Sequence, residues 1–110
     1  LAPMGRAMVP TGVAIQLPGP EYVALVCARS GLAIKRGLTL SNGVGVVDSD
    51  YRGEMQVGLV NLGPETYTIQ PGERIAQLMI LPVAQAAFRQ AETLDGTERG
   101  EGGFGSTGRL

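Results

Sequence analysis

The sequence predicts an all-β protein: a jelly-roll-like β-barrel or sandwich of short strands, with one short helix and a flexible, glycine-rich C-terminal arm. Three observations predict this class. Seventeen glycines and seven prolines among 110 residues disfavour long helices. Apolar segments recur at intervals of about ten residues, separated by turn-forming residues. From Asp95 onward, the composition changes to glycine and charges of both signs.

About eight short strands joined by turns are typical of a sandwich, jelly roll or barrel. The expected strands are residues 8–17, 22–28, 38–40, 44–47, 54–61, 66–69, 75–83 and, least regular, 84–91. Tyr22–Ala28 is continuously apolar, which predicts burial on both faces of that strand. Ser41-Asn42-Gly43 is a strong turn signal between two of the strands.

Residues 30–37 are the exception and predict a helix of one or two turns, which Ser30 can cap and Gly37 can end. Arg29 and Ser30 at the start of this helix offer a phosphate site, although a capped surface helix is the plain alternative. We expect a body over residues 1–94 and a flexible arm over 95–110. Phe104, isolated between glycines, belongs either to a disordered tail or to a ligand contact.

The absence of histidine removes several enzyme classes. Without it, the chain cannot form a Ser-His or Cys-His nucleophile pair or a histidine-bearing zinc site. A single cysteine cannot supply a cysteine cage, so zinc-dependent base deaminases are excluded. Any catalysis must depend on carboxylates, hydroxyls, arginines and backbone amides, with or without a hard metal ion.

A net charge of −1, from nine basic and ten acidic residues, predicts no nucleic-acid partner, because non-specific binding needs clustered excess Lys and Arg. The longest apolar stretches, Tyr22–Ala28 and Leu78–Ala84, are too short to cross a bilayer, so we expect no membrane partner. The lone Cys27 cannot form an internal disulfide, which fits a reducing compartment and favours the cytoplasm.

Four segments carry the polar residues that a nucleotide site needs. They are Ala28-Arg29-Ser30-Gly31-Leu32-Ala33, Gly45-Val46-Val47-Asp48-Ser49-Asp50-Tyr51-Arg52-Gly53, Pro71-Gly72-Glu73-Arg74-Ile75-Ala76-Gln77-Leu78, and Arg99-Gly100-Glu101-Gly102-Gly103-Phe104-Gly105-Ser106-Thr107-Gly108. In this order and spacing they resemble motifs two to five of the trimeric deoxyuridine triphosphatase (dUTPase) family. The resemblance implies hydrolysis of dUTP to dUMP and pyrophosphate by attack of water on the α-phosphorus. This reaction limits uracil in DNA and supplies dUMP for thymidylate synthesis.

In the family, the first Asp of motif three activates the attacking water, and Asp48 occupies that position here. Phosphoryl hydrolysis requires such a base. Residues i and i+2 of a strand share a face, so geometry alone leaves Asp50 open as the alternative. For Asp48 itself, a turn-forming Asp that caps its own backbone is the plain alternative.

The resemblance also implies how the substrate is bound. Tyr51 would lie against the deoxyribose and leave no room for a 2′-hydroxyl. A hairpin around Asn42–Asp48, including Val47, would pair with the edge of uracil and reject cytosine and thymine. Phe104 would stack on uracil as the arm closes like a lid. The other implied substrate contacts are Arg29, Ser30 and Gly31 of motif two, Gln77 of motif four, and Arg99, Gly105, Ser106 and Thr107 of motif five.

The family's first motif, an Ala-Gly-Tyr-Asp-Leu-like segment, is not found in the sequence, and we expect it upstream of Leu1. Mg²⁺ is implied by the family and by the charge of a triphosphate, but no metal ligand is identifiable among these residues. The family also implies a homotrimer that binds dUTP and dUMP. Two alternatives are a dCTP deaminase-like enzyme of the same fold and a non-catalytic, nucleotide-binding trimer domain.

Overall fold

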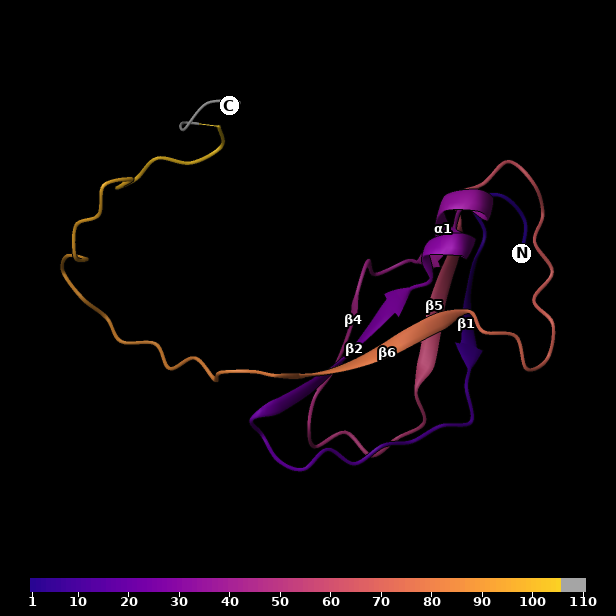
Figure 1. Cartoon of the computed structure of the whole chain (residues 1–110), viewed down its shortest axis with the longest axis horizontal. Helices are drawn as coiled ribbons and strands as arrows, with labels where there is room; N and C mark the ends of the chain where they lie inside the picture. Colours follow the sequence, from indigo (N-terminus) through magenta and orange to yellow (C-terminus); the bar gives the residue numbers. More distant parts are fainter. Residues whose placement is uncertain (106–110) are drawn as a thin grey trace.

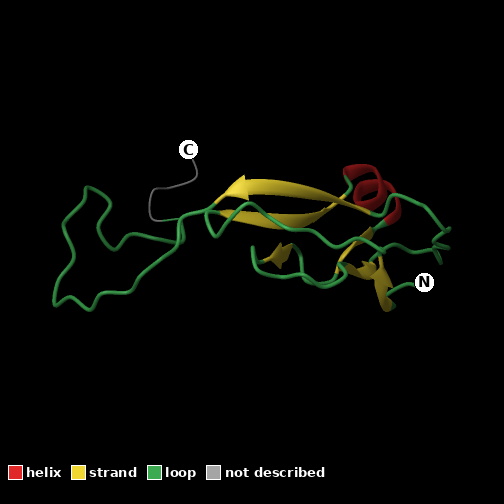
Figure 2. Cartoon of the chain, turned by 90° about the horizontal axis from the view of Figure 1, so that it is seen from below, coloured by secondary structure: helices red, strands yellow, loops and turns green. Residues whose placement is uncertain are grey.

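The computed structural model describes residues 1–105, which contain six strands and one helix. The strands form two three-stranded antiparallel sheets, in the orders β1-β5-β3 and β4-β2-β6. The sheets lie as two layers, and helix α1 (Ser30–Arg36) lies at one end of them (Figures 1 and 2). The prediction of an all-β, jelly-roll-like fold is confirmed. Within residues 1–105, no helix has the length and apolar character needed to span a membrane.

The first sheet consists of β1 (Arg6–Pro10), β5 (Gln56–Asn61) and β3 (Leu38–Leu40). Strand β5 lies in the middle, and its Leu59 pairs with Ala7 of β1 on one side and with Leu40 of β3 on the other. Every second residue of β5 is buried, as expected for a strand with one face on a core. The apolar alternation of this segment therefore sets which face packs inward.

The second sheet consists of β4 (Gly45–Val47), β2 (Tyr22–Ala28) and β6 (Ala76–Pro82). Strand β2 is central, so its Val26 pairs with β4 on one edge and with β6 on the other. Ala24 and Val26 on its inward face are buried, but the residues on the other face are only half-buried. The prediction that β2 is buried on both faces is therefore wrong for its outer face, which the described residues do not cover fully.

The core lies between the two layers. Its buried members are Val26, Leu38, Leu40, Val57 and Leu59. Full burial of such a side chain stabilises a fold by about 1.5–3 kcal/mol. Because the cluster draws on β2 as well as on β3 and β5, it holds the two sheets together.

The strand predicted for residues 8–17 ends at Pro10, so its second half is wrong. The hydroxyl of Thr11 donates to the carbonyl of Met55 at 2.7 Å and accepts from the N–H of Val13 at 3.1 Å. These bonds turn the chain away from the sheet, because a side-chain hydroxyl offers the backbone an alternative to ladder pairing.

The strand predicted for residues 66–69 is also wrong. The N–H of Tyr67 donates to the carbonyl of Leu1 at 2.9 Å, and the amino group of Leu1 donates to the carbonyl of Tyr67 at 2.6 Å. The amide of Asn61, which is fully buried, donates to the carbonyls of Leu1 and Glu65. These bonds satisfy the backbone groups of Tyr67 and the carbonyl of Glu65 without a sheet partner.

The predicted helix is confirmed at its end but not at its start. Gly37 has a φ of 77°, and its N–H caps the helix on the carbonyl of Ala33. The predicted Ser30 cap is wrong, because Ser30 is already the first helical residue and Arg29 precedes it without a side-chain capping bond. A side chain on Gly37 would collide with the backbone of Gly63, so the two chain segments cross only because residue 37 is glycine.

Beyond β6, the chain leaves the sheets as an extended segment (Figure 1). The last strand predicted, over residues 84–91, is wrong: these residues are exposed and irregular, and their Ala and Gln have low strand propensity. Val83 and Gln85 make the last hydrogen bonds to the body, to the carbonyls of Glu21 and Pro20. The radius of gyration is 18.9 Å, against about 13 Å for a compact domain of this length. The division that we predict between residues 94 and 95 lies within this exposed segment.

Candidate functional site

The segment from Asn42 to Asp48 links the two sheets. The predicted turn is present, with a φ of 76° at Gly43. The predicted hairpin is wrong, because β3 pairs with β5 whereas β4 pairs with β2. The leucines of β3 are buried on the core side of the first sheet. Because of this burial, β3 pairs with β5 and not with β4, which is nearer in the sequence.

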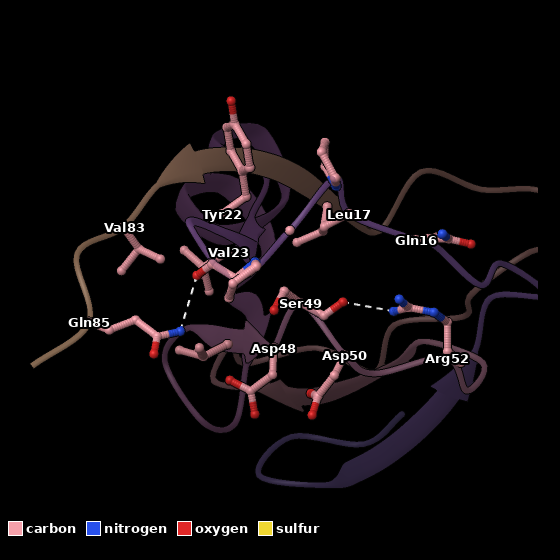
Figure 3. A pocket seen from close by; sticks show the side chains of 14 residues that line it. Gln16, Leu17, Tyr22, Val23, Asp48, Ser49, Asp50, Arg52, Val83 and Gln85 are labelled. Atoms are coloured by element: carbon pink, nitrogen blue, oxygen red, sulfur yellow. Dashed lines mark hydrogen bonds between the residues drawn. The ribbon is translucent and has the colours of Figure 1, made fainter.

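Asp48 directly follows β4 and is exposed. It lines two neighbouring cavities, one of about 730 Å³ shared with Asp50 and one of about 320 Å³ shared with Tyr51. Figure 3 shows that the two carboxylates extend in the same direction from the turn, as residues i and i+2 should. Of the two, Asp48 is the one that lines both cavities. We call the smaller one the tyrosine cavity.

Val47 and Tyr51 both line the tyrosine cavity, beside Met8 and Val26 of opposite sheets. Asn42 lies at the turn, and its side-chain nitrogen is 3.6 Å from the position that a Cβ atom on Gly45 would occupy. The structure thus brings three predicted site residues of the 42–51 region, Val47, Asp48 and Tyr51, into one cavity, whereas Asn42 lies outside its lining.

The predicted phosphate contacts of motifs two and four lie together at the C-terminal end of β2. They line a cavity of about 240 Å³, and its lining is Arg29, Ser30, Gly31, Leu32 and Gln77. Pairing of β2 with β6 brings them together, because Cys27 pairs with Gln77. We call this the arginine cavity.

Two hydrogen bonds orient the long side chains of the arginine cavity. The guanidinium of Arg29 donates from Nη1 to the carbonyl of Arg74 at 3.0 Å. The amide of Gln77 donates from Nε2 to the carbonyl of Ala28 at 2.9 Å. Both donors retain further N–H groups, so a bound anion could accept from them without breaking these bonds.

The tyrosine cavity reaches β2 at Val26, and the arginine cavity begins at Arg29, directly after the strand. At a rise of about 3.4 Å per residue, these two residues are about 10 Å apart along the strand. Among the described residues, the cavities of motifs two and three have no lining residue in common.

The motif-five residues within the described part lie on the exposed arm. Arg99 bonds only locally, from Nε to the carbonyl of Gly102 at 2.6 Å. Phe104 is fully exposed, with a φ of 47°, and Gly105 follows it at a φ of 87°. The predicted contacts Ser106 and Thr107 lie outside the described residues. The arm thus contributes nothing to either cavity of its own chain within residues 1–105.

Sequence reasoning missed the neighbours that shape the Asp48 turn. Arg52 donates from Nη1 to the carbonyl of Ser49 at 2.7 Å (Figure 3). Gln85 donates to the carbonyl of Pro20 across the larger cavity. The sequence shows that motif three contains Arg52, but it does not show the direction of the Arg52 side chain. No pattern in the sequence signals the Gln85 contact.

Residues 1–105 contain no cluster of three or more His, Cys, Asp or Glu side chains that could hold a metal ion. Asp48 and Asp50 are the carboxylates of the larger cavity. This donor set suits an ion such as Mg²⁺, which keeps most of its waters and is held by one or two carboxylates together with substrate phosphates.

A family model and a curated relative match nearly the whole chain. The family model, described as dUTPase, matches residues 1–108. The deoxyuridine 5′-triphosphate nucleotidohydrolase of Salmonella paratyphi A is 51% identical over 109 residues, which cover 99% of this chain and 72% of that protein.

Two solved phage structures resemble the fold. A variant of the dUTPase of Staphylococcus bacteriophage 80alpha, solved with dUpNHpp, is 29% identical, with a TM-score of 0.86 over 99% of this chain and 79% of its own. A variant of the dUTPase of phage phi11 of S. aureus is 23% identical, with a TM-score of 0.73 over 87% of this chain and 78% of its own. It is described as coordinating a structural Mg(II) ion, and at this identity it supports the fold alone.

Proposed function

The chain belongs to the dUTPase family, and on that premise we propose that it hydrolyses dUTP to dUMP and pyrophosphate, with water attacking the α-phosphorus. The observation that carries the proposal is the cavity shared by Asp48 and Tyr51, which puts a carboxylate beside the group expected at the deoxyribose. The reaction limits uracil in DNA and supplies dUMP for thymidylate synthesis. The curated relative is named for dUTP hydrolysis, which disfavours the dCTP deaminase-like alternative.

Asp48 is the general base in this proposal. It is preferred over Asp50 because, of the two, it alone borders the tyrosine cavity. Its carboxylate is exposed and can accept a proton from a water molecule that approaches the phosphate. A positioned base of this kind contributes about 10²–10⁴-fold to a rate.

The 42–51 region recognises the nucleoside. Val47 and Tyr51 border the cavity in which the base and sugar would lie, and Asn42, near Gly45 of β4, would pair with the edge of uracil. A site that pairs with the O4 acceptor of uracil leaves buried groups unpaired when cytosine enters. Tyr51 would occupy the space that a ribose 2′-hydroxyl needs.

The arginine cavity binds the phosphates. Arg29, Ser30 and Gln77 offer a guanidinium, a hydroxyl and an amide around one small cavity, and Gly31 lets a ligand approach the backbone closely. Charge-assisted hydrogen bonds from Arg are the strongest of these contacts. The free donors described above support this role.

The active unit is a homotrimer, in which separate chains supply the parts of one site. Two observations support association. The tyrosine and arginine cavities have no lining residue in common, and large apolar side chains of β6 and of the segment that directly follows it are exposed. These exposed residues are Leu78, Met79, Ile80, Leu81, Val83, Phe88 and Leu94. Exposed apolar surface of this extent is typical of an interface between proteins.

The arm over residues 95–110 acts as a lid on the nucleotide. Within residues 1–105 the ring of Phe104 is fully exposed, so it is available to stack on uracil, which contributes about 1–3 kcal/mol. Arg99 would reach the terminal phosphate, together with Gly105, Ser106 and Thr107. Closure would exclude water from the phosphates.

Mg²⁺ would enter with the triphosphate and lie near Asp48 and Asp50. When bound, the ion neutralises negative charge on the phosphates. The enzyme acts in the cytoplasm, where Cys27 remains a free thiol. It has no nucleic-acid or membrane partner, and the balanced charge of the chain supports the first of these statements.

Pyrophosphate release from dUTP, dCTP, dTTP and UTP with Mg²⁺ tests the reaction. We expect turnover of dUTP far above that of the other three nucleotides. Ammonia release from dCTP instead of pyrophosphate release from dUTP would favour the deaminase alternative. Nucleotide binding without any turnover would favour the non-catalytic one.

Two matched variants test the base. Asp48→Asn keeps shape but removes the proton acceptor, so we expect dUTP to bind with turnover lowered about 10²–10⁴-fold. Asp50→Asn is the control and should retain most turnover. The reverse pattern would assign the base to Asp50.

A further inference from the structure

Local contacts, not the core, hold the ring of Tyr51. This residue is 45% exposed. Its N–H donates to the carbonyl of Asp48 at 3.1 Å, and its hydroxyl donates to the carbonyl of Glu54 at 2.9 Å. Both partners lie within three residues of Tyr51, so the turn itself determines where the ring lies.

Gly53 lies directly beneath that ring. A Cβ atom on Gly53 would stand 2.5 Å from the Tyr51 hydroxyl oxygen, 2.7 Å from Cζ and 3.0 Å from Cε1. Such separations are far inside van der Waals contact, so any side chain at residue 53 must displace the ring. Gly53 is absent from the glycines with positive φ, so its backbone conformation is one that alanine adopts. The backbone of the turn can therefore accept a side chain at residue 53, but the Tyr51 ring cannot stay in its present position beside one.

The turn cannot relieve the clash by moving. On one side, Arg52 donates from Nη1 to the carbonyls of Ser49 at 2.7 Å and Tyr51 at 3.2 Å. On the other side, Met55 is buried, and its N–H donates to the carbonyl of Val13 at 2.8 Å. With the backbone held on both sides of Gly53, the exposed ring is the part that yields.

From this geometry we infer that Gly53 is a positioning residue for sugar selection. Its missing side chain lets the Tyr51 ring lie flat on the turn at the border of the cavity that also contains Asp48. The inference rests on the proposed role of Tyr51 in excluding a 2′-hydroxyl. A side chain at residue 53 moves the ring and opens the space that discriminates dUTP from UTP.

The test is a double-mutant cycle of Gly53→Ala and Tyr51→Ala, with kcat and KM measured for dUTP and UTP. For Gly53→Ala we expect the ratio of kcat/KM for UTP to that for dUTP to rise about tenfold, within the roughly 10²-fold that rejection of one added hydroxyl reaches. The predicted contacts are with the tyrosine oxygen and two ring carbons, and Tyr51→Ala removes all three atoms. In the Tyr51→Ala background, Gly53→Ala should therefore change the ratio about threefold or less, a coupling that the cycle isolates.

Equal effects of Gly53→Ala in both backgrounds would mean that residue 53 only supports the turn, and would overturn the inference. Tyr51→Ala separates this failure from that of the proposed function. If Tyr51→Ala raises UTP use and Gly53→Ala does not, the inference alone is wrong. If Tyr51→Ala leaves the ratio unchanged, the role of Tyr51 itself is wrong. Should Gly53→Ala not fold by circular dichroism, the double variant Tyr51→Ala with Gly53→Ala decides: a clash with the ring requires that folding returns once the ring is removed, and a double variant that also fails to fold would overturn the inference.

Discussion

Strands β5 and β6 are both rich in apolar residues, yet a single chain buries only one of them. Leu59 of β5 has no exposed surface, whereas Leu78, Met79, Ile80 and Leu81 of β6 are each between 39% and 46% exposed. Strand β5 alternates buried and half-buried residues, while β6 shows no alternation. An apolar run identifies a strand, but it does not tell whether the same chain or a neighbouring one covers it.

The difference predicts that equal substitutions in the two strands have unequal effects on folding. Leu59→Ala leaves a cavity between the sheets, so we expect the free energy of unfolding to fall by about 2–5 kcal/mol. Urea denaturation followed by circular dichroism measures it. A loss below about 1 kcal/mol would mean that the core between the sheets does not stabilise the fold.

The chain segments at Gly37 and Gly63 cross closely beside the first sheet, and this crossing leaves no room for a side chain at either residue. A Cβ atom on Gly63 would collide with the carbonyl oxygen of Arg36, at the end of α1. We expect Gly63→Ala to lower the free energy of unfolding by about 1–3 kcal/mol, as overpacking commonly does. Gly96→Ala is the matched control, since a Cβ atom there meets nothing within 4 Å. Equal stability of the two variants would contradict the tight crossing.

Leu81→Ala completes the comparison from the exposed strand. At protein concentrations where the chain is monomeric, we expect the free energy of unfolding to change by about 0.5 kcal/mol or less, as for most surface sites. At higher concentration, sedimentation velocity should show weaker association than in the unaltered chain. If Leu81→Ala destabilises the monomer as much as Leu59→Ala, the contrast between the two strands is wrong.

The smallest expected effect lies in the 62–75 loop. The hydroxyl of Tyr67 donates to Oε1 of Glu73 at 2.6 Å, and this hydrogen bond, followed by burial, raises the pKa of Tyr67 above 10.0. A pKa raised on folding gives stability that is complete below the unfolded value and is lost as pH rises through the folded value. Thermal unfolding from about pH 8 to about pH 12 should therefore show an alkaline decrease that Tyr67→Phe reduces. An unchanged profile in Tyr67→Phe would exclude this bond as its source.

Local chemistry predicted those features of the fold that depend on neighbouring residues alone. The turn at Gly43, the helix end at Gly37 and the bounds of Tyr22–Ala28 follow from residue types within a few positions. The pairing of β3 with β5 does not, because burial of its leucines overrides proximity in the chain. The strand predicted for residues 66–69 is wrong because the backbone of Tyr67 bonds to Leu1. That partner is 66 residues away, so neighbouring residues do not reveal it.

The candidate site shows the same limit. Family motifs predicted which residues carry the chemistry, and pairing of β2 with β6 brings Arg29 and Gln77 into one cavity. The support that Gly53 and Arg52 give to motif three depends on side-chain directions, which no periodicity encodes. Within residues 1–105, the arm lines neither the tyrosine cavity nor the arginine cavity.

Strand β2 sets the spacing between the tyrosine cavity and the arginine cavity. Its rise per residue is fixed, so one added residue would lengthen the span by about 3.4 Å and turn every following side chain to the opposite face. Gain or loss of sequence between Tyr22 and Ala28 would thus misalign the tyrosine and arginine cavities. Irregular stretches such as residues 11–21 can absorb such changes, so natural length variation should concentrate there.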